Sequence, residues 1–411
     1  MIKKLPISWL QILCFSVLFL LVNIQDVKAS HAMGADLSYE CINPSTNTYK
    51  VTLRFYRDCF GIDAPASITL NYSSASCGQN LNATLLQQPC PPNATGGAPC
   101  EVSPLCPSSI GLSTCNGGTL PGVEAYTYTA TIILPQRCTD WTFSFDECCR
   151  NAAITNLANP GNEDMFVRAT LNNTIAGCNS SPVFTTLPVP YICVNQPFSY
   201  NHGAVDPDGD SLVYSLVTPL GVNGAPVTYA AGFTPTYPLS TNTGTFPFNT
   251  ATGQLNFTPN TIQTAVVTVL VQEYRNGVVI GTTMRDIQVV VVNLSGCANP
   301  TPTFSGVIQP TLQNGIYINP SLVQVCPDQS LSFSTLAVEQ GGDSIFVESN
   351  ISQSIPGAQF ITHYTSRDSM SGLFQWTPTA LDTGTHTFIV TVRNHNCPLT
   401  SSQAYAVTIQ V

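Results

Sequence analysis

The sequence contains an internal repeat, and this repeat limits the fold more than any other feature. Residues 192–212 and residues 325–345 align without a gap and are identical at eight positions. Further along, the segment 253–259 (GQLNFTP) has a counterpart at 372–378 (GLFQWTP), and a Val- and Thr-rich stretch follows each of them. Segments that recur in the same order with similar spacing indicate two copies of one domain.

The local pattern of the chain is typical of β-structure. Short runs of alternating or β-branched residues, such as 49–55 and 126–134, are separated by clusters of Gly, Pro and Asn. No window of 12 or more residues has the apolar period of a helix. We therefore expect an all-β protein, with a Cys-rich N-terminal β domain at 30–180 and two tandem antiparallel β-sandwiches at 181–296 and 297–411.

The N-terminus has the features of a secretory signal peptide. Lys3 and Lys4 precede an apolar run at 9–22, and small residues end at Ala29. This run of 14 residues is shorter than the about 20 that a membrane-spanning helix requires. We expect residues 1–29 to be removed and the protein to be secreted or displayed at the outer cell surface, with no transmembrane segment after cleavage.

Cysteine usage agrees with export. Cys14 leaves with the signal peptide, and eleven of the remaining fifteen cysteines lie between Cys41 and Cys178. In an exported chain this density predicts a disulfide framework, whereas a zinc cluster is disfavoured because the sequence has no C-x-x-C pair. We expect the adjacent Cys148 and Cys149 to join two separate bridges. Since fifteen is odd, one cysteine is free, pairs with another chain or has lost its partner.

The charge balance excludes some partners. The net charge is −10, and after residue 28 the only Lys is Lys50. Without a basic stripe the chain has nothing to neutralise a phosphate backbone, so we expect no nucleic-acid binding, and anionic membrane surfaces are disfavoured for the same reason.

The segment 206–212 (DPDGDSL) is the sharpest candidate site. Asp206, Asp208 and Asp210 alternate on a turn and can direct oxygens at one hard cation, which is the chemistry that Ca²⁺ requires. An EF-hand is excluded because its twelfth position is Val217. We expect a further ligand from elsewhere in the fold, and Glu273, at the end of a predicted strand, is the candidate. The alternative is a hydrogen-bonded turn without a metal.

The second copy has a weaker version of this segment. Asp206 is replaced by Glu339, the middle acid by Gly341, and only the last acid is kept, as Asp343. We expect a weak calcium site or none in the second copy. Retention of the turn without the middle carboxylate indicates that part of its role is architectural.

Two resemblances extend these expectations. The segment 204–216 (AVDPDGDSLVYSL), with 181–184 as an opening strand, resembles the cadherin-like, dystroglycan-type calcium-binding module of bacterial surface proteins. That resemblance implies immunoglobulin- or cadherin-like sandwiches in which the acidic turn and one acid of a late hairpin hold Ca²⁺.

The second resemblance covers the first unit. The motifs at 30–39, 51–61 and 148–151 resemble the opening of very large Bacteroidetes proteins, which are described as gliding-motility-associated or type B sorting-domain proteins of type 9 secretion. Those proteins end in a sorting domain after many repeats, whereas this sequence stops at Val411.

A disulfide expected in the first copy of the repeat has a consequence for the end of the sequence. Cys297 follows the last strand of the first copy and can meet Cys193 at the same domain end. The equivalent partner of Cys326 would then lie beyond Val411. We therefore expect this sequence to be a truncated form of a longer protein.

Catalytic motifs are absent from the sequence, which has no G-x-S-x-G, H-E-x-x-H, P-loop or G-x-G-x-x-G pattern. His202, close to the acidic turn, is expected to be a hydrogen-bonded loop residue rather than a base or ligand. We expect a non-enzymatic structural or adhesive protein, a rod of Ca²⁺-stiffened sandwiches that contacts an extracellular protein or glycan surface. The alternative is a carbohydrate-binding accessory region of a secreted hydrolase, with aromatic residues between 229 and 248 as a stacking surface, although packing of that loop is the favoured interpretation.

Overall fold

The computed structural model describes residues 32–90, 100–188 and 191–411. As the sequence predicts, regular structure in these residues is almost entirely β-strand, and their one α-helix is the short α2 (Ile351–Ser354). The expected signal peptide, residues 1–29, lies outside the described residues. In the described part of the chain, no helix has the length and apolar character needed to cross a membrane.

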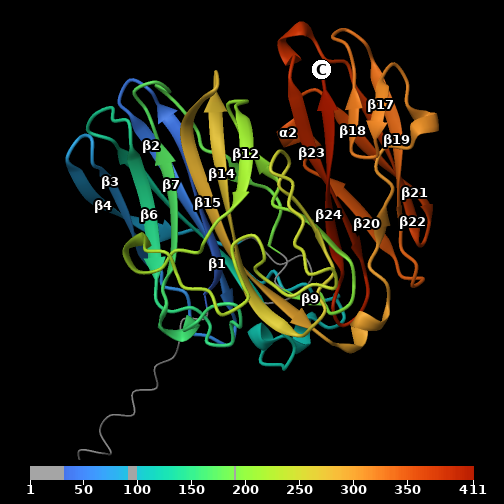
Figure 1. Cartoon of the computed structure of the whole chain (residues 1–411), viewed down its shortest axis with the longest axis horizontal. Coiled ribbons are helices and arrows are strands. Elements are labelled where there is room, and N and C mark those ends of the chain that lie inside the picture. Colours follow the sequence, from blue (N-terminus) through green and yellow to red (C-terminus); the bar gives the residue numbers. More distant parts are fainter. Residues whose placement is uncertain (1–31, 91–99, 189–190) are drawn as a thin grey trace, which may run out of the picture.

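The first unit contributes seven strands to an eleven-stranded sheet. These strands are β1 (Ala32–Asn43), β2 (Thr48–Asp58), β3 (Ser67–Ser74), β4 (Gln79–Gln87), β5 (Val123–Ile133), β6 (Trp141–Glu147) and β7 (Met165–Leu171). They follow the order β1-β2-β5-β4-β3-β6-β7 in the sheet, and β6 and β7 alternate buried and more exposed residues (Figure 1). The buried faces enclose a core of aliphatic and aromatic side chains, including Leu53, Trp141 and Phe143.

A long hairpin joins the first unit to the first copy of the repeat. Its strands are β14 (Gln263–Arg275) and β15 (Val278–Val292). One edge of β15 pairs with β14, while the other edge pairs in turn with β7, β1 and β9 (Tyr191–Cys193). The 15 residues of β15 extend about 50 Å, more than one sandwich needs. The sheet therefore continues across the expected boundary between 180 and 181, although each unit keeps its own hydrophobic cluster.

Most strand pairings of the second copy have a counterpart in the first copy. The other strands of the first copy are β8 (Val183–Phe184), β10 (Phe198–Asn201), β11 (Ala204–Val205), β12 (Ser211–Leu216) and β13 (Gln254–Phe257). The strands of the second copy are β16 (Thr303–Phe304), β17 (Ile316–Asn319), β18 (Leu322–Gln324), β19 (Leu331–Val338), β20 (Ile345–Ser349), β21 (Gln359–Ser366), β22 (Ser369–Trp376), β23 (Thr385–Asn394) and β24 (Ser402–Gln410).

Individual residue pairs show how closely the copies correspond. Phe198 lies opposite Phe257 in the first copy, and Leu331 lies opposite Trp376 at the equivalent place in the second. Each copy also has one parallel pair, β9 with β15 and β18 with β24. The second copy is a sandwich of a four-stranded and a five-stranded sheet. The repeat inferred from the sequence is thus confirmed, and so is the all-β fold of immunoglobulin-like sandwiches.

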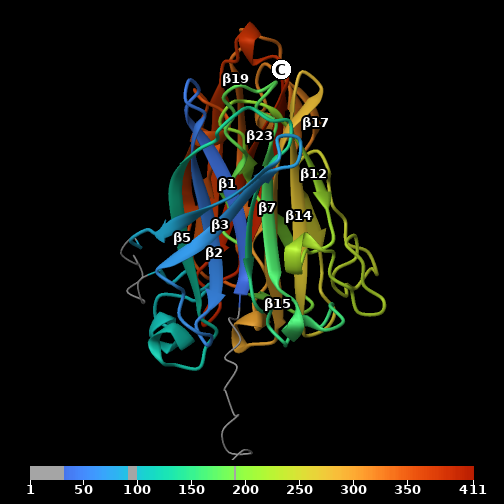
Figure 2. The same ribbon diagram turned by 90° about the vertical axis from the view of Figure 1, so that its left-hand side faces the viewer.

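The two copies lie side by side, so the expectation of a rod is wrong for this pair. Gln254 donates a hydrogen bond to the carbonyl of Ala404 (3.0 Å) and accepts one from the backbone N–H of Ala406 (2.9 Å). Ile389, Ala404 and Ala406 of the second copy also belong to the hydrophobic cluster of the first. Figure 2 shows the consequence: the strands of the first unit are in front, and the second copy lies behind them.

Seven disulfides connect the described residues. They are Cys41–Cys178, Cys59–Cys115, Cys77–Cys138, Cys90–Cys100, Cys106–Cys397, Cys148–Cys149 and Cys193–Cys297. The disulfide framework, the Cys193–Cys297 bridge and the single leftover cysteine are confirmed, and that leftover residue among the described cysteines is the exposed Cys326. The expectation that Cys148 and Cys149 join separate bridges is wrong, because they are bonded to each other.

Buried ion pairs hold the first unit on the hairpin. Arg150, which is 2% exposed, donates two hydrogen bonds of 2.9 Å to the carboxylate of Asp286 on β15. The Nε of Arg285 lies 3.3 Å from a carboxylate oxygen of Asp36 on β1. The motif residues Asp36 and Arg150 therefore form the junction between the units, which gives them an architectural role.

Candidate metal centre

The acidic turn connects β11 to β12 and is held by its own first carboxylate. Oδ1 of Asp206 accepts hydrogen bonds from the backbone N–H groups of Asp208 (2.9 Å) and Asp210 (3.0 Å). Gly209 has a φ of +82°, a left-handed conformation that a residue with a side chain rarely adopts. The sequence DPDGD therefore forms a tight turn that uses Oδ1 of Asp206 for its own hydrogen bonds.

Strand pairing brings Glu273 to this turn. Glu273 lies on β14 opposite Leu212 of β12, two residues after the turn. Single carboxylate oxygens of Asp206, Asp210 and Glu273 lie within 4.8 Å of one another. The structure thus brings together three of the four predicted ligands from two separate parts of the chain.

Three carboxylate oxygens at the centre of this group have no hydrogen-bond partner among the described residues. Glu273 is 0% exposed, and neither of its carboxylate oxygens has a hydrogen-bond partner among the described residues. Oδ2 of Asp206 is likewise buried without a partner there. A buried and unpaired carboxylate is costly, so such a cluster needs either a proton or a cation between its oxygens.

Burial also changes how these acids titrate. Burial, together with the negative charge of Asp206, raises the pKa of Glu273 from 4.5 to about 9. Burial is also the main cause that raises the pKa of Asp206 to about 6. A cation at this position would favour the ionised form of both groups and would displace the proton that otherwise remains on Glu273.

Asp208 lies apart from the other three acids. Its Oδ2 accepts a hydrogen bond from the backbone N–H of Ser180 (2.7 Å) and lies 3.7 Å from the guanidinium of Arg275. Of the predicted ligands, Asp208 is therefore the one that ties the turn to the end of the first unit.

Arg275 and Asn179 are parts of the site that the sequence analysis missed. The guanidinium of Arg275 pairs with the carboxylate of Asp210 and donates a hydrogen bond of 2.7 Å to Oδ1 of Asn179. The positive charge of Arg275 thus balances the negative charge of Asp210. Among the described residues, no ion pair balances the charge of Asp206 or Glu273. Neither residue lies in a segment of the repeat that aligns in the sequence, so the sequence offered no signal for them. The strand pairings place Asn299 and Asn396 at the equivalent positions of the second copy.

The second copy has amides where the first copy has a carboxylate and an arginine. Asn394 takes the place of Glu273, and Asn299 donates hydrogen bonds to Asp343 (3.0 Å) and to Asn396 (3.2 Å). The backbone N–H of Asp343 donates to Glu339 (2.8 Å). Oε1 of Glu339 and Nδ2 of Asn394 have no hydrogen-bond partner among the described residues. The second copy therefore has fewer carboxylates at this place, and a weaker calcium site there stays a prediction.

His202 is not the hydrogen-bonded loop residue that we expected. It is 0% exposed, and neither ring nitrogen has a hydrogen-bond partner in the described part of the chain. Its ring packs against Tyr200, with ring centroids 4.9 Å apart, and against Phe184, at 6.1 Å. Burial is the main cause that holds the pKa of His202 well below 6.5, and the positive charge of Arg285 lowers it further.

We expect His202 to make the fold sensitive to acid. The unfolded chain binds a proton at His202 below pH 6.5, whereas the folded chain does not, so the contribution of His202 to stability is constant above pH 6.5 and falls as the pH decreases below it. The loss is about 1.4 kcal/mol for each pH unit. Urea denaturation of the wild type and His202→Phe between pH 7.5 and 4.5 measures it. Equal pH slopes for the two proteins would contradict this expectation.

The aromatic residues between 229 and 248 pack on the sandwich, as favoured. Phe246 is 6% exposed within the core of the first copy, and Tyr237 and Phe248 pack against that core. Tyr229 packs on a smaller cluster formed with Ile154 and Val227. This loop therefore presents little aromatic surface for stacking.

The comparisons with known proteins assign no function. No family model matches the sequence, and no curated protein matches it. Similar solved structures include an endo-fucoidan hydrolase of glycoside hydrolase family 107, with 10% identity over 70% of this chain and 36% of that chain and a TM-score of 0.18. They also include Dpr2 Ig1-Ig2 in complex with DIP-Theta Ig1-Ig3, with 8% identity over 88% and 93% and a TM-score of 0.18. Titin domains I67-I69 have 9% identity over 88% and 91% and a TM-score of 0.17. Such scores carry no argument about activity.

Proposed function

We propose that this chain is a non-enzymatic, extracellular structural or adhesive protein in which one Ca²⁺ braces the junction of the first unit and the first copy. Asp206, Asp210 and Glu273 would hold the ion. The observation that carries this proposal is the convergence of buried carboxylate oxygens of Asp206 and Glu273 that have no partner among the described residues.

The position of the site supports a bracing role. Asp206 and Asp210 belong to the turn before β12, and Glu273 belongs to the long hairpin that pairs with the first unit. Asp208 and Arg275 connect the same turn to residues 179 and 180 of the first unit. Because the folded chain alone assembles the three carboxylates, an ion bound there stabilises the fold by mass action.

Direct titration tests the proposal. Calcium added to the chelator-treated chain should bind with a stoichiometry of one per chain in isothermal titration calorimetry. The heat should change with the ionisation enthalpy of the buffer, because binding displaces a proton from Glu273, whose pKa is raised to about 9. A chain that takes up no calcium at millimolar concentration would contradict the calcium site.

We also propose that the protein is displayed at the cell surface and belongs to the gliding-motility-associated, type B sorting-domain proteins of type 9 secretion. The many disulfides and the immunoglobulin-like fold are typical of extracellular proteins. The three motifs of the resemblance support the proposal because they adjoin in the fold: β1 pairs with β2, and Ala32 forms a bridge with Arg150.

A further inference from the structure

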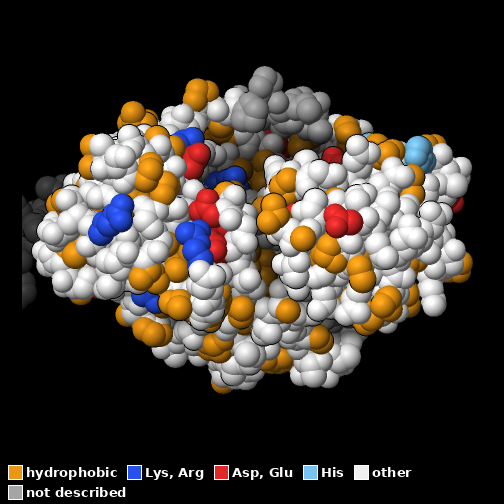
Figure 3. All heavy atoms as spheres, turned by 90° about the horizontal axis from the view of Figure 1, so that it is seen from above, with side chains coloured by type: hydrophobic (Ala, Val, Ile, Leu, Met, Phe, Trp, Pro, Cys, Tyr) orange, Lys and Arg blue, Asp and Glu red, His pale blue; other side chains and the backbone are white. Residues whose placement is uncertain are grey.

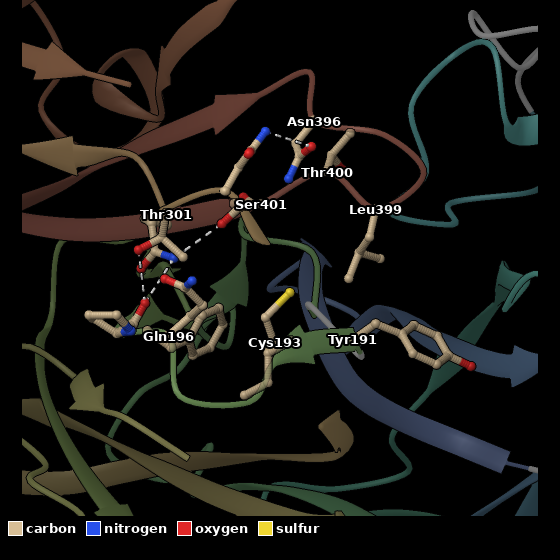
Figure 4. Close-up of a pocket in the computed structure, with 14 residues that line it drawn as sticks. Tyr191, Cys193, Gln196, Thr301, Asn396, Leu399, Thr400 and Ser401 are labelled. Carbon is tan, nitrogen blue, oxygen red and sulfur yellow. Dashed lines mark hydrogen bonds between the residues drawn. The ribbon is translucent and has the colours of Figure 1, made fainter. Parts of the chain in front are cut away.

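A cleft separates the second copy from the rest of the chain, and Figure 3 shows it as a hollow between two lobes. It consists of a cavity of about 570 Å³ and a neighbouring one of about 440 Å³. Thr185, Leu187 and Gln353 line both cavities, so the two are parts of one cleft. Volumes of this order are typical of ligand sites. By contrast, the polar cavity between the two copies in Figure 4 has only about 20 Å³, which is room for about one water.

The walls of the cleft are fixed to each other. The disulfide Cys106–Cys397 joins a loop of the first unit to the second copy. Asn350, next to α2, donates a hydrogen bond of 2.9 Å to the hydroxyl of Thr185, which lies on the opposite wall. A cleft with such connections is formed before any ligand binds, which lowers the entropic cost of binding.

The lining of the cleft combines neutral polar groups with apolar side chains and has few charges. The hydroxyl and amide side chains include Thr185, Thr186, Ser349, Ser352, Gln353 and Thr391. Of the two arginines in the lining, Arg393 pairs with Glu348, whereas Arg54 donates a hydrogen bond to the carbonyl of Phe184, which is neutral. Such a surface offers both donors and acceptors and a single arginine without an acidic partner among the described residues.

One aromatic ring is exposed in this polar lining. Phe346 of β20 is 41% exposed, and its ring packs against His395 with centroids 4.2 Å apart. Both residues line the larger cavity. Because His395 packs against one side of the ring, the orientation of Phe346 is fixed, and its exposed surface is available to stack on a ligand.

We propose that this cleft binds a neutral oligosaccharide. A sugar ring presents an apolar face of C–H groups and a rim of hydroxyls, which match the Phe346 ring and the surrounding hydroxyl and amide groups. A sulfated or uronic-acid chain carries an anionic group on many of its sugar rings, whereas the lining offers only one arginine without an acidic partner in the described part of the chain, Arg54, because Arg393 is paired. This inference names the ligand class of the proposed adhesive function and rests on that function.

Binding of defined hexasaccharides to the full chain tests the proposal. The probes are β-1,3-glucan, β-1,4-glucan, β-1,4-mannan and chitin hexasaccharides, with a sulfated oligosaccharide and an acidic peptide for comparison. We expect at least one neutral hexasaccharide to bind, and Phe346→Ala to weaken its affinity roughly tenfold. Gln353→Ala should weaken it as well.

The control is a ring of similar exposure outside the cleft. Tyr364 on β21 is 65% exposed, belongs to the other sheet of the second copy and is absent from the lining of both cavities. Tyr364→Ala should leave the affinity unchanged. Failure of every neutral hexasaccharide to bind, binding of the charged probes alone, or equal affinities of wild type and Phe346→Ala would overturn the inference. A chain that takes up calcium but no oligosaccharide would keep the calcium site and lose this inference.

Discussion

Calcium should raise the melting temperature of the wild-type chain and leave that of Glu273→Gln almost unchanged. An ion at a hundredfold excess over its dissociation constant stabilises the folded chain by about 2.7 kcal/mol, or about 3 °C in a chain of this length. Glu273 supplies two of the three oxygens of the site that are buried without a partner in the described part of the chain, so its loss removes the strongest reason for an ion to bind. Thermal unfolding followed by circular dichroism, with calcium and with chelator, measures the difference.

The same variant should behave in the opposite way without calcium. The folded chain retains the proton of Glu273 up to a pKa of about 9, whereas the unfolded chain releases it near 4.5. Glu273 therefore destabilises the calcium-free chain increasingly as the pH rises from 4.5 towards 9. A neutral amide avoids this effect, so Glu273→Gln should be more stable than wild type in chelator at pH 7, by about 3 kcal/mol.

Two further variants separate the metal site from general effects of removing an acid. Asp208→Asn lies outside the converging oxygens and should retain most of the calcium response. Asp343→Asn removes the equivalent of Asp210 from the second copy, where Asn394 takes the place of Glu273, and should retain all of it. If wild type and Glu273→Gln melt alike in calcium and in chelator, the site holds no calcium.

The site shows what spacing in a sequence can and cannot predict. Alternate acids on a Gly-containing turn indicate convergence, and Asp206 and Asp210 do converge with Glu273. Asp208 differs because a backbone N–H at residue 180 lies within reach of its carboxylate. That contact depends on how the first unit meets the first copy, which no local pattern in the sequence encodes.

The fold was likewise predictable only in part, because local sequence patterns indicate pairings within a copy but not contacts between units. Copies of a repeat predict equivalent pairings, and Phe198–Phe257 and Leu331–Trp376 are such a pair. The shared sheet depends instead on one strand, β15, which is long enough to pair with β7, β1 and β9 along a single edge. The length of this strand was not predicted, because Gly281, Arg285 and Asp286 interrupt the apolar pattern between 278 and 292.

The junction between the first unit and the first copy should be the part of the molecule most sensitive to substitution. Arg150→Met should lower the free energy of unfolding by about 3–5 kcal/mol. The substitution leaves Asp286, which is 1% exposed, without its main charge partner. Arg150 also donates hydrogen bonds to the carbonyls of Asp164 and Leu220 (both 3.0 Å), so the loss extends to the neighbouring loops. Urea denaturation with fluorescence and circular dichroism as separate probes measures the change.

An exposed ion pair of the second copy provides the matched control. The side chains of Arg393 and Glu348 are 44% and 64% exposed, so Arg393→Met should cost less than about 1 kcal/mol. The double variant Arg150→Met, Asp286→Leu should recover much of the stability, because no buried charge is then left unpaired. A loss below 1 kcal/mol for Arg150→Met would refute the structural role of the pair. Since Arg150 belongs to the first unit and Asp286 to the first copy, a large loss seen equally by both probes would mean that these two units fold as one.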